Sequence, residues 1–210
     1  MNFNLFKNTV PESVKIIAVS KTKPIEKIKE IYDLGHRDFG ENKVQEMVKK
    51  QLNLPKDIKW HLIGKLQRNK VKYIAPFVHL IHSVDSEKLL NQINKEGVKN
   101  NRVINLLLQI KISSDPLKTG FDYDDLNNLF SNSFLDKYSS IKVLGLMAMG
   151  SADKSKNENE FKILSNFFKK INRLQNLRYL SLGMSNDYKL AIKHNSNMIR
   201  IGSLIFGSRS

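Results

Sequence analysis

The stretch VKIIAVSKTKP at residues 14–24 decides the fold. Its residues 16–19 are apolar and lack the three-to-four-residue spacing of a helix, a pattern typical of a strand buried on both faces of a parallel sheet. Lys21 lies two residues after the end of this strand. Burial favours the neutral lysine amine, and a neutral amine can attack a carbonyl carbon to form a Schiff base, so Lys21 is a candidate nucleophile. The alternative, a solvated lysine at a strand end, stays open on this stretch alone.

Length and composition restrict the class of protein. The chain has 210 residues, which is within reach of one large α/β domain, and it contains no cysteine. Disulfides, cysteine-based zinc sites and thiol catalysis are therefore excluded. Residues 1–9 lack the basic start and apolar core of a signal peptide, and no apolar run approaches the ~20 residues that span a bilayer. We expect a cytoplasmic protein without a membrane segment.

The charge of the chain is strongly positive, with a formal net charge of +15. Such a balance raises the question of a nucleic-acid partner. The excess is mostly lysine and is spread along the sequence, whereas nucleic-acid surfaces tend to cluster arginine with aromatic residues. We interpret the charge as solvated helix faces and predict no nucleic-acid partner; an acidic partner is the alternative.

Apolar segments and amphipathic helices alternate along the chain, and this alternation predicts a parallel sheet. Eight units without a linker favour a closed (β/α)8 barrel of the TIM type, one domain over residues 1–210, with short loops and an exposed loop at 150–159. The predicted strands are 16–19, 37–40, 59–63, 78–84, 103–112, 141–149, 179–182 and 198–201. The predicted helices are 25–32, 43–52, 66–74, 86–96, 122–130, 158–174 and 187–194.

In such a barrel the site is built from the carboxyl ends of the strands, and phosphate is often held after strands seven and eight. Gly-Met-Ser at 183–185 and Gly202–Ser203 follow these two predicted strands. Glycines let backbone N–H groups approach a phosphate, and serine adds a hydroxyl donor. Each turn alone is also an ordinary turn sequence. Together with Lys21 they suit a phosphorylated aldehyde, of which pyridoxal 5′-phosphate (PLP) is the obvious one.

At this point the sequence resembles the YggS/PROSC family of PLP-binding, PLP-homeostasis proteins. The matching segments run in family order over nearly the whole chain: AVSKTKP at 18–24, FGENKVQE at 39–46, WHLIGKLQRNK at 60–70, KTG at 118–120, GLMAM at 145–149, LGMSNDYKLAI at 182–192 and IRIGSLIFGSR at 199–209. The resemblance implies a barrel like the alanine racemase N-terminal domain and PLP bound as an imine to Lys21.

The resemblance also implies roles for individual residues. Ser185 and the Gly202–Ser203 pair would hold the phosphate, and Arg200 would face the pyridine nitrogen. Asn42 would lie beside the ring, and Met184 would line the phosphate end. Family members often carry tyrosine where Lys43 stands.

Several rival interpretations remain. Lys23 competes with Lys21, but it precedes a proline and is leaving the strand. His79 and His82 are three apart, so on a strand they would point to opposite faces and share no metal; we predict no metal site. The Ser151-x-x-Lys154 spacing is read as chance.

The predicted function is a PLP carrier or buffer in PLP homeostasis, without substantial turnover and without catalytic residues of its own. A PLP-dependent racemase or decarboxylase is the alternative. Racemases of this fold class take a second base from an additional β-domain, for which the chain leaves no residues. We therefore expect a monomer whose partners are PLP and PLP-dependent apoenzymes.

Overall fold

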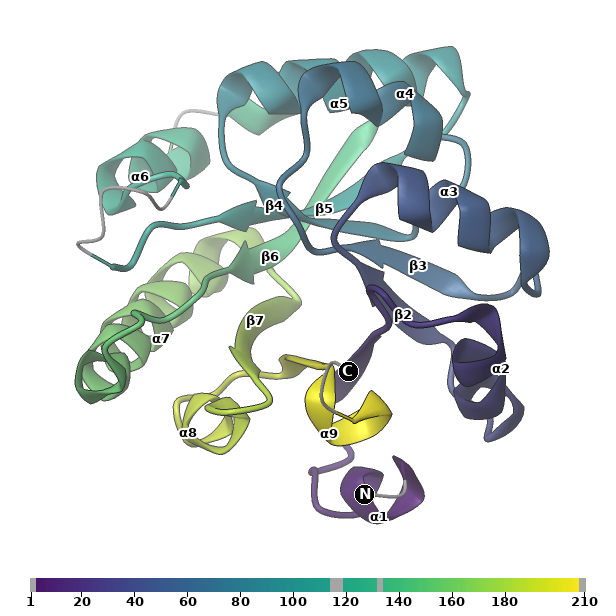
Figure 1. Cartoon of the computed structure of the whole chain (residues 1–210). Helices are drawn as coiled ribbons and strands as arrows, with labels where there is room; N and C mark the ends of the chain where they lie inside the picture. Colours follow the sequence, from purple (N-terminus) through teal and green to yellow (C-terminus); the bar gives the residue numbers. More distant parts are fainter. Residues whose placement is uncertain (1–2, 114–118, 132–133, 208–210) are drawn as a thin grey trace.

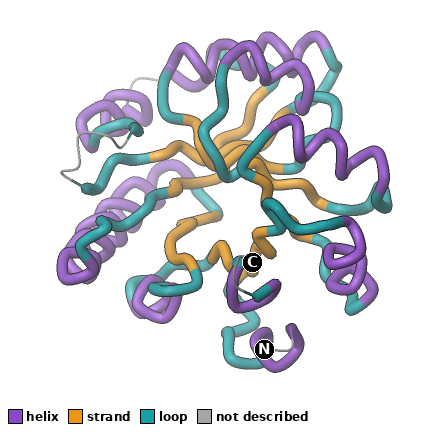
Figure 2. The backbone as a smooth tube through the Cα atoms, in the orientation of Figure 1, coloured by secondary structure: helices purple, strands orange, loops and turns teal. Residues whose placement is uncertain are grey.

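The computed structural model describes residues 3–113, 119–131 and 134–207. Its eight strands form one closed barrel in sequence order, and every neighbouring pair is parallel, including the closing pair β1 and β8. The strands gather in the centre and the helices lie around them (Figures 1 and 2). The predicted (β/α)8 fold class is confirmed.

The strands are β1 (Lys15–Val19), β2 (Asp38–Glu41), β3 (Lys59–Leu62), β4 (Leu80–Val84), β5 (Ile104–Gln109), β6 (Ile141–Met147), β7 (Tyr179–Met184) and β8 (Met198–Ile201). The α-helices are α1 (Phe3–Lys7), α2 (Ile25–Asp33), α3 (Val44–Asn53), α4 (Val71–Ile74), α5 (Glu87–Lys99), α6 (Tyr123–Ser131), α7 (Asn157–Gln175), α8 (Tyr188–Lys193) and α9 (Ser203–Phe206). Three 3₁₀ turns, η1 (Arg68–Lys70), η2 (Phe134–Lys137) and η3 (Lys154–Lys156), complete the described elements.

The predicted strands and helices match most of these elements to within a few residues, with three informative differences. Helix α1 was not predicted; Phe3 and Phe6 are buried, and the helix lies beside α9 (Figure 1). Strand β2 extends to Glu41, which was expected in the following loop and is fully buried. The polar loop expected at 150–159 ends early, because α7 begins at Asn157. Lys118 and Arg209 of the family-like segments lie outside the described residues.

Most apolar side chains pack between the barrel wall and the helices, and a smaller apolar layer fills the barrel interior. That inner layer consists of Ile17, Leu80, Leu107, Met147 and Met198. Polar side chains are also buried within the barrel, among them His61, His82 and Ser181 with no exposed surface. Because buried polar groups are costly without partners, these side chains must be bonded to one another.

None of the helices within the described ranges is long and apolar enough to cross a bilayer.

Candidate functional site

A pocket of about 360 Å³ opens where the carboxyl ends of β1, β2, β7 and β8 meet. This volume lies within the ordinary range for small-molecule sites. Every residue predicted as a site residue from the sequence lies in the lining of this one pocket: Lys21, Asn42, Met184, Ser185, Arg200, Gly202 and Ser203. The rival Lys23 and the apolar Val19 and Ile63 line it as well.

Lys21 lies in a tight turn rather than on the strand itself. Strand β1 ends at Val19, and the Lys23 N–H donates to the carbonyl of Ser20 at 3.0 Å. Between them Thr22 has a φ of 63°, in the left-handed region that a β-branched residue rarely adopts. The Thr22 N–H donates to Glu46 Oε1 at 2.6 Å. A strained residue held by a neighbouring helix is typical of a functional turn.

A buried ionic network holds this turn against β2 and α3. The ammonium of Lys50 donates to Glu41 Oε1 at 2.8 Å, to Glu46 Oε1 at 2.7 Å and to the Ser20 carbonyl at 2.8 Å. The Ser20 hydroxyl donates to Glu41 Oε1 at 2.6 Å. Burial raises the pKa of Glu41, while Lys50 and the Ser20 hydroxyl oppose the rise. The network therefore fixes the backbone that carries Lys21.

The two candidate lysines differ in their surroundings. The ammonium of Lys23 donates to the carbonyls of Phe206 and Gly207, at 3.2 and 3.4 Å. These bonds tie Lys23 to the end of α9. Both lysines are half-buried and line the pocket, so the bonds of Lys23 to the end of α9, and not burial, distinguish it.

Gly64, directly after the predicted strand 59–63, positions Asn42. A Cβ at this glycine would overlap the carbonyl oxygen of Asn42 and lie 2.7 Å from its Cα. The Ser83 hydroxyl donates to the Gly64 carbonyl at 2.6 Å and holds the loop in place. Only glycine allows the two segments to approach so closely, which brings Asn42 to the pocket.

The turns after β7 and β8 are joined directly. The Gly202 N–H donates to the Ser185 hydroxyl oxygen at 3.2 Å. Gly183 has a φ of 90° and its Cα faces Ala191 and Tyr188 so closely that a Cβ would lie 2.7 Å from the Ala191 Cβ. Met184 is 42% exposed at the pocket rim. The expected phosphate turns thus lie side by side at one end of the pocket.

Arg200 lies at the inner end of the pocket and is almost fully buried. Its Nη1 donates to the Ser181 carbonyl at 2.9 Å and to the Ser181 hydroxyl at 2.8 Å, and its Nη2 donates to the Ala148 carbonyl at 3.0 Å. These partners are neutral oxygens rather than a carboxylate. Burial lowers the pKa of Arg200 to about 10, so the guanidinium stays charged at neutral pH.

The prediction that His79 and His82 point apart is wrong. His79 precedes β4, so the alternation of a strand does not apply to it, and both rings lie against His61 with centroids 5.3 and 5.2 Å away. Ligand atoms of Asp38, His61 and His79 lie within 4.8 Å of one another, a spacing that could hold a metal. However, the Lys15 ammonium lies 3.2 Å from both carboxylate oxygens of Asp38 and occupies them. We assign no metal there.

This protein has the features of a ligand-binding (β/α)8 barrel. Its parallel barrel is closed, and the pocket at the carboxyl ends of the strands is lined by lysine, arginine and serine. The family model described as the alanine racemase N-terminal domain matches residues 1–210, and the chain belongs to this family.

Curated relatives show which proteins of this family the chain is similar to. A protein of Aquifex aeolicus named "Pyridoxal phosphate homeostasis protein" is 37% identical over 205 residues, covering 93% of this chain and 87% of the relative. A Schizosaccharomyces pombe protein of the same name is 38% identical, covering 94% and 85%. The structure of PipY from Synechococcus elongatus with PLP bound superposes with a TM-score of 0.87 at 34% identity, covering 97% of both chains. The resemblance to the PLP-homeostasis family is confirmed.

Proposed function

We propose that this chain is a PLP-binding protein of PLP homeostasis, which holds the cofactor without substantial turnover. The observation that carries the proposal is the gathering of Lys21, Arg200, Ser185 and Ser203 in one pocket of about 360 Å³. The names of the curated relatives and the PLP-bound PipY structure support it. When bound, PLP supplies a reactive aldehyde and a ring that can draw electrons from an attached amine.

The residues of the pocket fit this cofactor in a consistent order. Lys21 would hold the aldehyde covalently at the β1 end of the pocket. Ser185, Gly202 and Ser203 would hold the phosphate, with Met184 at that end and Asn42 beside the ring. Arg200 would face the pyridine nitrogen. Because arginine donates hydrogen bonds and accepts none, it disfavours a proton on that nitrogen. An unprotonated ring draws electrons poorly, which suits holding over catalysis.

The first prediction tests the covalent link. Reduction of the PLP-loaded protein with borohydride should place the label on Lys21, because Lys23 is bonded to the carbonyls of Phe206 and Gly207. Peptide mapping by mass spectrometry identifies the labelled lysine. Lys23→Arg should retain the visible absorbance and Lys21→Arg should lose it. Label on Lys23 would refute the assignment.

The second prediction tests the phosphate end. A hydrogen bond to a charged group contributes about 1.5–3 kcal/mol, so Ser203→Ala and Ser185→Ala should each weaken PLP binding by roughly 10- to 150-fold. Equilibrium titration of absorbance measures the affinity, and pyridoxal, which lacks the phosphate, serves as the control ligand. Ser13→Ala is the control variant, because Ser13 is an exposed serine that precedes β1 and does not line the pocket. Equal affinity in all variants would place the phosphate elsewhere.

The finer parts of the proposal concern the cellular role. We propose a cytoplasmic, single-domain monomer that passes PLP to PLP-dependent apoenzymes. The exposure of the pocket rim supports transfer, because Met149 and Met184 are 36% and 42% exposed and leave a path to solvent.

Sedimentation of the loaded protein tests the monomer, and activation of an added apoenzyme tests the transfer. Chiral analysis of alanine tests the alternative, a racemase: turnover on the enzymatic scale of ~1–10³ s⁻¹ would favour it.

A further inference from the structure

A continuous chain of buried hydrogen bonds runs through the barrel interior from Arg200 to Asp38. Arg200 Nη1 lies 2.8 Å from Ser181 Oγ, and Ser181 Oγ lies 3.4 Å from His82 Nδ1. His82 Nε2 lies 2.9 Å from His61 Nδ1, and His61 Nε2 lies 2.9 Å from Asp38 Oδ1. The intervening Ser181, His82 and His61 are fully buried, so water does not compete for these bonds.

The two end groups, Asp38 and Arg200, fix the direction of every hydrogen bond in this series. Asp38 as a carboxylate only accepts, so His61 donates from Nε2 and its Nδ1 is an acceptor. His82 must then donate from Nε2 and accept at Nδ1, and the Ser181 hydroxyl donates to that nitrogen. The lone pairs of Ser181 are thereby left for Arg200, which only donates. All donors point from Arg200 toward Asp38.

This assignment requires neutral histidines and an ionised Asp38. Burial lowers the pKa of His61, against the opposing effect of Asp38, and burial lowers the pKa of His82 well below 6.5. Burial raises the pKa of Asp38, but the hydrogen bond from His61 and the hydrogen bonds and positive charge of Lys15 oppose this effect and hold the pKa below its ordinary value. Both requirements are met at neutral pH.

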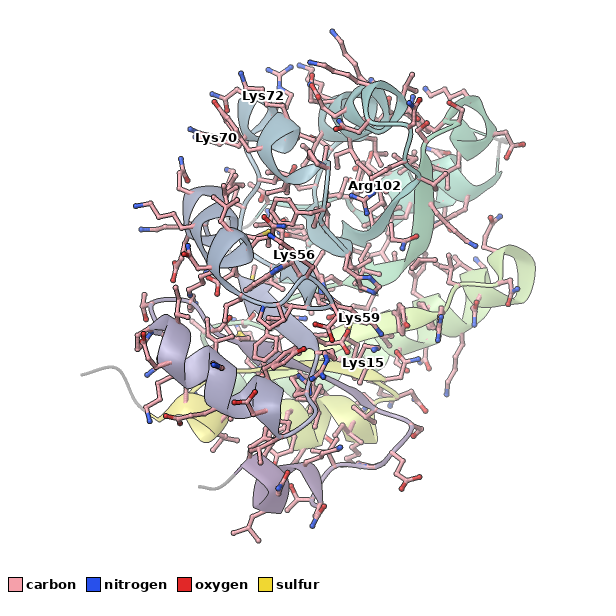
Figure 3. All side chains as sticks on the ribbon, turned by 90° about the vertical axis from the view of Figure 1, so that its right-hand side faces the viewer. Lys15, Lys56, Lys59, Lys70, Lys72 and Arg102 are labelled. Carbon is pink, nitrogen blue, oxygen red and sulfur yellow. The ribbon has the colours of Figure 1, made fainter. Side chains whose placement is uncertain are left out.

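The chain of hydrogen bonds ends at the opposite mouth of the barrel from the ligand pocket. Asp38 and Lys15 lie where β2 and β1 begin, and both line a second cavity of about 640 Å³. Lys59, the register partner of Asp38, also begins its strand here. Figure 3 shows Lys15 and Lys59 close together on one face, with Lys56, Lys70, Lys72 and Arg102 above them. Asp38 does not line the ligand pocket.

We propose that Ser181, His82, His61 and Asp38 are positioning residues for Arg200, so that a carboxylate at one mouth of the barrel sets the hydrogen bond that a bound pyridine ring nitrogen receives at the other. This inference rests on the proposed function. The negative charge of Asp38 polarises each hydrogen bond of the series toward the carboxylate. Hydrogen bonds that are linked and polarised in this way strengthen one another. Ser181 then holds Nη1 of Arg200 firmly, and the guanidinium keeps its remaining donors directed into the pocket.

The first arm of the test needs no ligand. Nitrogen NMR of ¹⁵N-histidine-labelled protein should show His61 and His82 as neutral rings protonated at Nε2. Asp38→Asn, which keeps the shape and removes the charge, should alter the signals of both rings. Asp57→Asn is the matched control, because it removes a carboxylate that is paired with Arg37 on the outer surface. An Nδ1-protonated His82, or signals indifferent to Asp38→Asn, would overturn the chain.

The second arm uses PLP labelled with ¹⁵N in the ring. In Asp38→Asn and in Ser181→Ala the ring-nitrogen resonance should move toward that of a free, unprotonated pyridine, because Arg200 donates a weaker bond. Asp57→Asn should leave it unchanged. Thermal unfolding confirms that each variant is folded. A resonance that is identical in all variants would overturn the positioning role while leaving PLP binding intact. Failure of the unsubstituted protein to bind PLP would instead refute the proposed function, with the first arm still deciding the chain.

Discussion

Lys50→Met is expected to lower the free energy of unfolding by about 3 kcal/mol, the lower end of the range for breaking a buried ion pair. The substitution removes the donor that serves Glu41, Glu46 and the Ser20 carbonyl. Glu41 has no exposed surface, and one of its carboxylate oxygens already lacks a hydrogen-bond partner among the described residues. The loss stays near the lower end because the raised pKa of Glu41 lets it take up a proton.

Urea denaturation measures this effect, and Lys49→Met is the matched control, since Lys49 is the exposed neighbour on the same helix. Adding Glu41→Gln to Lys50→Met should recover part of the loss, because no buried charge is then left without a partner. Equal stability of the two single lysine variants would show that the network does not stabilise the fold. Because Glu46 also binds the Thr22 N–H, Lys50→Met should loosen the Lys21 turn and weaken PLP binding as well.

The second large effect is a loss of stability in mild acid. Burial lowers the pKa of His36 to about 4 and that of His79 to about 4, and it lowers the pKa of His61 and His82 also. Below the ordinary histidine pKa of 6.5, the histidines bind protons in the unfolded chain, whereas in the folded chain they stay neutral. The stabilisation that comes from the neutral histidines is therefore fully present above pH 6.5 and is lost as the pH falls toward 4. The loss is at most about 1.4 kcal/mol per pH unit for each buried histidine, and it is smaller for the partly exposed His79.

Urea denaturation at several pH values tests this slope. Glu41 acts in the opposite direction, since its raised pKa favours the folded state in acid, but it is one group against four. His36→Phe is the diagnostic variant, because the ring packs against Phe3 and Phe39 with centroids 5.0 and 5.3 Å away. It should reduce the slope by about 1.4 kcal/mol per pH unit. A stability that stays constant from pH 7 to 5 contradicts the prediction.

The barrel and the pocket lining could be predicted because they depend on local sequence. The apolar run at 16–19 indicates a buried strand, and Lys21 or Gly202–Ser203 must then lie where a strand ends. The alternation of strands and helices then closes the barrel without knowledge of any particular contact.

The polar groups inside the barrel could not be predicted, because their contacts depend on register between distant strands. His61, His82 and Ser181 come from β3, β4 and β7, and nothing in their local sequence indicates that their side chains meet. Glu41 follows the predicted strand 37–40, and its local sequence does not show the partner that allows a carboxylate to lie buried inside a strand. Lys50, its partner, lies on the next helix.

The pairing of β1 with β8 determines when the ligand pocket can exist during synthesis. Lys21 is made early, but Arg200, Gly202 and Ser203 belong to the last strand and the turn after it. A growing chain that has reached only β7 has its first and seventh strands unpaired along one edge, and such edges are prone to pair with other chains. The barrel closes and the pocket forms in the same late event, so a nascent chain exposes Lys21 long before it can enclose a cofactor.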